Sequence, residues 1–73
     1  MKGGNKMVRI SLEATRVNTH MKQVEWAKAL GVSQATVINW EKGNTEPSLS
    51  QLRKMSELSG IPMDFIFVPE EAD

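Results

Sequence analysis

The stretch ALGVSQATVINWEKG, which runs from Ala29 to Gly43, decides how this chain folds. Gly31 can adopt a positive φ at little cost, which suits the end of a helix. Ser33 is a favourable N-cap for the next helix, which we expect at about 34–42. The stretch therefore predicts two helices that are joined by a very short turn.

The spacing of small and apolar residues around this turn is demanding. Counting from Gln23, the sequence places Ala27 four residues on, Gly31 eight, Val37 fourteen and Trp40 seventeen. Ala27 must be small because the following helix crosses close above it, and Val37 and Trp40 fill the angle between the two helices. Two helices joined by a short glycine-containing turn form a helix-turn-helix.

A helix is predicted before this motif, and the motif itself opens with another. Ser11 is a suitable N-cap for a first helix at about 11–18. Its apolar stripe would consist of Ile10, Ala14, Val17 and Met21. The second helix is expected at about 22–30, and its inward residues would be Trp26, Ala27 and Leu30.

Two more short helices are predicted after the motif. Ser48 followed by Gln51 forms a capping box for a fourth helix, which Gly60 ends. Its inward stripe would be Leu49, Leu52 and Met55. Pro62 suits the start of a last short helix, in which Met63, Ile66 and Phe67 pack inward.

Five short helices without strand alternation make the predicted fold class all-α. With 73 residues the chain holds one small domain. We expect a flexible N-terminal arm at 1–9, a helix-turn-helix domain at 10–67 and an acidic C-terminal tail at 68–73. The first residues lack an apolar run suited to a signal peptide or a membrane span, which favours a cytoplasmic protein with no membrane partner.

The charges are divided unevenly along the chain. The net charge is zero, but all nine Lys and Arg residues lie in 1–54, where four acidic residues leave a net charge of +5. Residues 55–73 hold five acidic residues and no base. The sum therefore hides a basic part, which is compatible with a nucleic-acid partner.

Enzymatic chemistry is not indicated. No Ser/His/Asp triad, paired-carboxylate constellation or Gly-rich phosphate loop is visible. The chain has no cysteine, and His20 is its sole histidine, so the sequence offers no metal site of the His/Cys kind. We expect no catalytic residue, no metal and no cofactor.

Over residues 10–67 the sequence resembles the XRE family, the phage repressor/Cro type of helix-turn-helix domain. The resemblance rests on MKQVEWAKALGVSQATVINWEKGNTEPSLSQLRKMSELSGIPMDFIF, with G-V-S, V-x-x-W-E-x-G and P-S-L in the family's order. It implies a five-helix lambda-repressor-like fold of a prokaryotic or phage protein. It also implies a homodimeric transcriptional regulator, by default a repressor, which places helix 34–42 in the major groove of a pseudo-palindromic operator.

Base reading is expected from the outward face of that helix. Gln and Asn amides can pair with adenine N6 and N7 together, which suits Gln34 and Asn39. Ala35 can contact a thymine methyl group, and Thr36 should meet bases or nearby phosphates.

Phosphate contacts are expected from helix ends. By resemblance, Gln23 contacts the DNA backbone, and a second phosphate-contacting segment holds Lys42, Asn44 and Thr45. Lys22 stands where the family usually has a small polar cap, and a lysine facing the positive end of a helix dipole is unfavourable unless a phosphate binds there. Alternatively, the helix starts at Thr19 and Lys22 is an ordinary first-turn residue.

The sequence also predicts a structural ion pair and an apolar docking surface. Arg16 and Glu41 resemble the family's partly buried ion pair, a structural link between the first and third helices. Phe65 and Val68 fall off the inward stripe, which indicates a docking surface for a second copy. The alternative function is an antitoxin-like or phage accessory module that binds a protein partner through these residues and the acidic tail.

Overall fold

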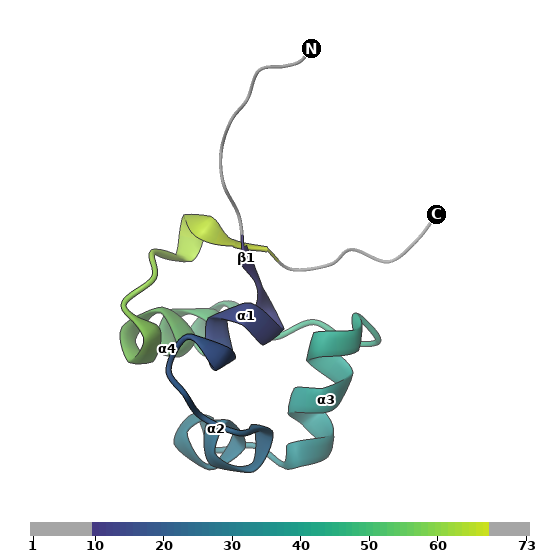
Figure 1. The fold of residues 1–73 in the computed structure, drawn as a ribbon. Coiled ribbons are helices and arrows are strands. Elements are labelled where there is room, and N and C mark those ends of the chain that lie inside the picture. The colour runs from purple at the N-terminus through teal and green to yellow at the C-terminus, as the bar shows by residue number, and fades with distance from the viewer. Residues whose placement is uncertain (1–9, 68–73) are drawn as a thin grey trace.

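Residues 10–67 are described by the computed structural model of this protein, and for Phe67 only the backbone is described. The predicted arm, 1–9, and the predicted tail, 68–73, lie outside the described residues. The elements are β1 (Ile10–Ser11), α1 (Leu12–Val17), α2 (Gln23–Leu30), α3 (Gln34–Lys42), α4 (Leu49–Ser59), the 3-10 turn η1 (Met63–Phe65) and β2 (Ile66–Phe67). Figure 1 shows α3 standing across α2, with α4 on the other side of the molecule.

The helix-turn-helix lies where the sequence predicts it. Gly31 ends α2 with φ 74°, and Gly43 ends α3 with φ 83°. The Ser33 hydroxyl oxygen accepts a hydrogen bond from the Thr36 backbone N–H at 3.1 Å, so the expected N-cap of α3 is confirmed. Gly31 ends α2 and Ser33 begins α3, so the two helices are joined within three residues. The turn therefore sets the angle between α2 and α3.

A small core holds the two helices in place. Its buried apolar residues are Leu12, Trp26, Ala27, Leu30, Val37, Trp40, Met55 and Ile66. Trp26 is 1% exposed and Trp40 is 6% exposed, so both indoles serve packing and neither is available for stacking on bases. The inward residues predicted for α2 and α3 are confirmed.

The predicted stripe of the first helix is wrong except at Met21, which packs against the core. α1 is only six residues long, and Ile10 belongs to a strand. Leu12 and Thr15 face the core, whereas Val17 is 52% exposed. Thr15 is fully buried, and its hydroxyl is satisfied there by donating to the Ser11 carbonyl oxygen at 2.8 Å. On α4, Leu52 and Met55 pack inward as expected, but Leu49 is 62% exposed.

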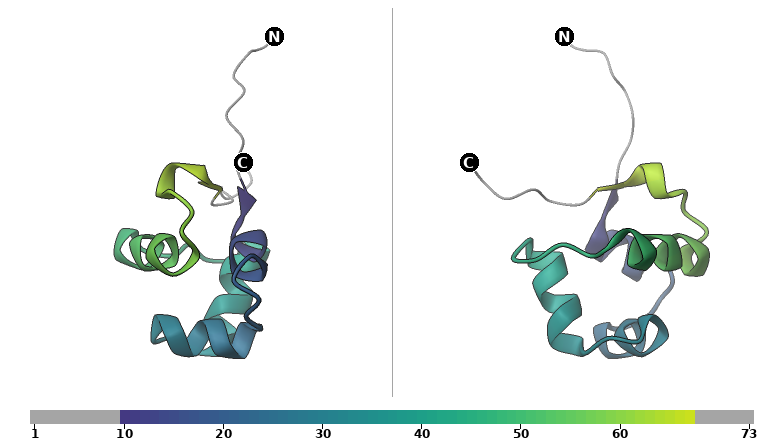
Figure 2. Two further views of the ribbon diagram at one scale, coloured as in Figure 1. Left: turned by 60° about the vertical axis from the view of Figure 1, so that its left-hand side comes forward. Right: turned by 180° about the vertical axis from the view of Figure 1, so that it is seen from behind.

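The fifth α-helix is replaced by a turn and a strand, so the five-helix prediction is corrected to four α-helices within residues 10–67. After Pro62 the chain makes the single 3-10 turn η1 and then becomes extended at Ile66. β2 pairs with β1 in parallel, with Ile10 opposite Ile66 and Ser11 opposite Phe67. The described residues are mostly helical, with this two-stranded sheet in addition. Figure 2 shows the sheet and η1 at the end of the molecule opposite to α2.

Candidate nucleic-acid interface

A buried ion pair links the helices that carry the predicted site. Arg16 Nε donates to Glu41 Oε2 at 2.7 Å, and Nη2 donates to Oε1 at 3.2 Å. The two side chains are 11% and 8% exposed. Arg16 Nη1 also donates to the Met21 carbonyl oxygen at 3.1 Å, which ties the linker before α2. The structure thus has the ion pair between α1 and α3 that the resemblance implies.

The hydrogen bond to Glu41 raises the pKa of the Arg16 guanidinium, and burial opposes this effect. A raised pKa in the folded state favours the charged form. The stabilisation from this group is therefore fully present at neutral pH, and it is lost only as the pH rises through the raised value.

The same carboxylate holds the first residue of α2. Gln23 Nε2 donates to Glu41 Oε1 at 3.1 Å. Since a carboxylate only accepts hydrogen bonds, this contact fixes which end of the Gln23 amide faces α3. One N–H of that amide is left for a ligand, as a phosphate contact requires.

Lys22 is the N-cap residue of α2, so the alternative helix start at Thr19 is wrong. The Glu25 carboxylate accepts from the Lys22 backbone N–H at 2.8 Å. A lysine side chain cannot accept a hydrogen bond in return, and Lys22 is exposed. An exposed cation at the positive end of α2 fits a site for an anion.

The outward face of α3 carries the predicted base-reading residues. Gln34 and Ala35 are exposed, and the Gln34 side chain makes no hydrogen bond within residues 10–67. The Thr36 hydroxyl lies 2.9 Å from the Ser33 hydroxyl, so Thr36 is already engaged in the cap. Asn39 is half-buried, one turn further along.

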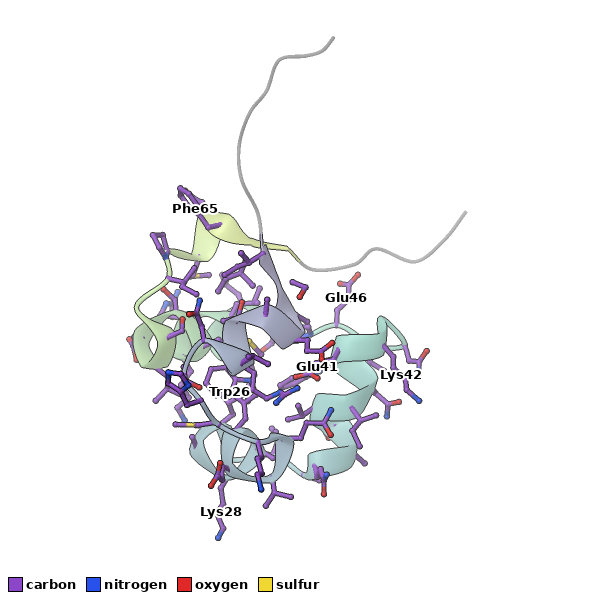
Figure 3. The ribbon with its side chains drawn as sticks, in the orientation of Figure 1. Trp26, Lys28, Glu41, Lys42, Glu46 and Phe65 are labelled. Atoms are coloured by element: carbon purple, nitrogen blue, oxygen red, sulfur yellow. The ribbon has the colours of Figure 1, made fainter. Side chains whose placement is uncertain are left out.

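The segment after α3 folds back over its last turn. Gly43 N–H donates to the Trp40 carbonyl oxygen at 3.1 Å, and Asn44 N–H donates to the Asn39 carbonyl oxygen at 2.9 Å. These are the two hydrogen bonds of a Schellman motif. Lys42 and Thr45 are exposed beside it. Figure 3 shows Lys42 pointing away from the helices and Glu41 pointing between them.

Sequence reasoning missed two residues on this face. Ile38 is half-buried, and helical spacing places it between Gln34 and Lys42. An apolar group there suits a thymine methyl. Glu46 is exposed in the loop after α3 and would oppose a phosphate there. The sequence signal for Ile38 is an outward Ile between polar residues. Nothing in the local pattern identifies Glu46.

Phe65, in η1, is 42% exposed, as its position off the inward stripe predicts. Val68 lies outside the described residues. Among residues 10–67 there is no group of three His, Cys, Asp or Glu residues that could hold a metal ion. None of the helices in this range is long and apolar enough to cross a membrane.

Comparisons with known proteins identify relatives of this chain by sequence. The family described as Helix-turn-helix matches residues 12–66. An uncharacterized HTH-type transcriptional regulator of Methanocaldococcus jannaschii is 37% identical over 60 residues, which cover 82% of this chain and 91% of that protein. One of Archaeoglobus fulgidus is 30% identical over 66 residues, with 90% and 93% covered.

A longer HTH-type transcriptional regulator, from Haemophilus influenzae, is 36% identical over 42 residues, which cover 58% of this chain and 18% of that protein. No solved structure matches. The family match spans the same helices that the Gly31 turn and the Arg16–Glu41 ion pair join together. With its turn, its buried ion pair and its relatives in agreement, the chain belongs to the XRE-type helix-turn-helix family.

Proposed function

We propose that this protein is a sequence-specific DNA-binding transcriptional regulator that inserts α3 into the major groove. The observation that carries the proposal is the outward face of α3, where exposed Gln34 and Ala35 precede Asn39 on a helix anchored by a buried ion pair. The Gln34 amide, which makes no hydrogen bond within residues 10–67, is free to read base edges. The relatives named as transcriptional regulators support the same function.

Two helix ends would hold the DNA backbone on either side of this face. At one side, the start of α2 offers its backbone N–H groups, the Gln23 amide and exposed Lys22. At the other, Lys42, Asn44 and Thr45 form an exposed polar segment. Contacts of this kind fix the register of a protein on DNA, and base contacts then specify the sequence.

A homodimer acting as a repressor is the form we propose. Phe65 presents an apolar ring at the end of the molecule opposite to α2, where a second copy can dock without covering α3 (Figure 3). A two-fold pair would place its recognition helices about 34 Å apart, on successive turns of the same face of DNA. Occupying a promoter in this way blocks polymerase.

Selection from a random DNA pool, followed by footprinting, tests the function. We expect a pseudo-palindromic site with half-sites about one helical turn apart. Selected DNA without any consensus would contradict sequence-specific binding. A single half-site would contradict the dimer and leave the reading function intact.

Phosphate contacts predict how binding depends on salt. The affinity should fall linearly with salt on logarithmic axes, in proportion to the phosphates engaged. Lys42→Ala should weaken binding to all sequences alike and reduce this slope by about one. Arg53→Ala is the matched control: Arg53 is exposed on α4, and its removal should leave the slope unchanged. If the wild type and Lys42→Ala had equal salt dependence of affinity, the predicted phosphate contact of Lys42 would be contradicted.

The alternative function, a module that binds a protein partner, uses the same exposed Phe65. It gives no role to the exposed polar residues of α3, which is a different element from η1. A stoichiometric partner together with no binding to any DNA at low salt would favour this alternative.

A further inference from the structure

The side chains of Asn39 and Asn44 are hydrogen-bonded to each other. Asn44 Nδ2 donates to Asn39 Oδ1 at 3.1 Å. Asn39 is the expected base reader on α3, and Asn44 belongs to the segment expected to contact phosphate. The contact therefore connects two residues for which separate roles are predicted.

The backbone builds this contact. Gly43 has φ 83°, which turns the chain so that Asn44 lies back over the last turn of α3. Asn44 N–H then donates to the Asn39 carbonyl oxygen at 2.9 Å, and Thr45 N–H donates to the same oxygen at 3.4 Å. In a Schellman motif these two positions usually make an apolar contact. Here both positions hold amides, whose hydrogen bond takes the place of that contact.

We infer that Asn44 is a specificity-determining residue that acts through Asn39. The Asn39 oxygen is turned toward Asn44, so Asn39 presents its NH₂ group, a donor, to the major groove. An unconstrained Asn amide pairs bidentately with adenine through both its oxygen and its nitrogen. A donor-only amide instead fits edges that carry acceptors, and guanine offers two, N7 and O6.

This inference rests on the proposed function and refines one part of it. At the base pair that Asn39 reads, the wild type should accept guanine at least as well as adenine. Cytosine, whose exposed edge offers only the N4 donor, should be rejected. The resemblance to the family, in which the Asn39 amide would be free, implies instead a preference for adenine at this base pair.

Removing the donor should change the base that is read. In Asn44→Ala the Asn39 amide is released, so we expect the preference for adenine over guanine to rise about tenfold at that one base pair. Asn44→Asp should go further, because a carboxylate accepts from the Asn39 NH₂ and turns its oxygen toward the groove. This variant should therefore increase the binding of cytosine.

The test is selection and competition binding with DNA varied at each position of the site. Asn39→Ala identifies the base pair concerned, since the preference there should become flat. Thr45→Ala is the matched control: it removes a neighbouring exposed side chain and should lower the affinity without altering any base preference. Ratios of affinities cancel the uniform loss that a missing phosphate contact causes.

Three results distinguish the possible failures. A wild type that prefers adenine, with the same preference in Asn44→Ala, would overturn this inference and leave the DNA-binding function intact. A shift equally large in Thr45→Ala would overturn it too, because the effect would then not be specific to the Asn39–Asn44 contact. A wild type without sequence preference at any position would contradict the proposed function itself. Thermal melting of each variant confirms that it is folded.

Discussion

Arg16→Met should destabilise the fold by about 3–5 kcal/mol, because it leaves the Glu41 carboxylate buried without its partner. Glu41 is 8% exposed and accepts two hydrogen bonds from Arg16. A single core of this size rarely supplies more than about 3–5 kcal/mol in total. Arg16→Met should therefore be largely unfolded, and Gln23 should lose its fixed orientation with it.

Urea unfolding followed by tryptophan fluorescence measures this effect, since Trp26 and Trp40 are both buried. Glu13→Gln is the matched control. Glu13 Oε2 lies 3.9 Å from Arg16 Nη2 and its side chain is 67% exposed, so its contribution should be below about 1 kcal/mol. Arg16→Met with Glu41→Leu should recover much of the loss, because no charge is left unpaired. Equal stabilities of Arg16→Met and Glu13→Gln would show that the buried pair does not hold the fold.

The double substitution Gln34→Ala with Asn39→Ala should lower the affinity for the selected site about a hundredfold or more. Each good contact to a base edge is worth about 1–3 kcal/mol of discrimination. Neither substitution removes a charge, so binding to unrelated DNA, which depends on phosphate contacts, should hardly change. Competition binding on specific and random duplexes at one salt concentration measures both quantities.

Lys42→Ala provides the contrast, because it should weaken specific and nonspecific binding by the same factor. If the double substitution also lowered specific and nonspecific affinity by one common factor, the distinction between base-reading and phosphate-contacting residues would be wrong. Circular dichroism should show unchanged helicity, since alanine at Gln34 and Asn39 favours a helix.

The sequence was sufficient to predict α2, α3 and the turn between them. Their core faces follow from helical spacing, and Gly31 and Ser33 mark the turn by local backbone and capping preferences. The last segment could not be predicted in the same way. Ile66 becomes extended because it pairs with Ile10, which is distant in sequence, and a local pattern carries no information on such a pairing.

The candidate site was predicted by residue type but not by contacts. Gln23 and Asn39 are each hydrogen-bonded within the chain, to Glu41 and to Asn44. Both contacts depend on how separate turns bring side chains together, which the order of residues does not reveal. The exposure of Gln34 and Ala35 could be predicted from the helical period alone, because it follows from the burial of Val37 and Trp40.

Site-directed cross-linking tests most directly whether the outward face of α3 meets DNA. The chain has no cysteine, so a single introduced thiol can carry a photo-reactive group at one chosen place. Ala35→Cys labels α3, and Leu58→Cys, on α4 and 40% exposed, labels the other side of the molecule. The account predicts cross-links to bases of the selected site from position 35 and none from position 58. Cross-links from position 58 with none from position 35 would contradict it.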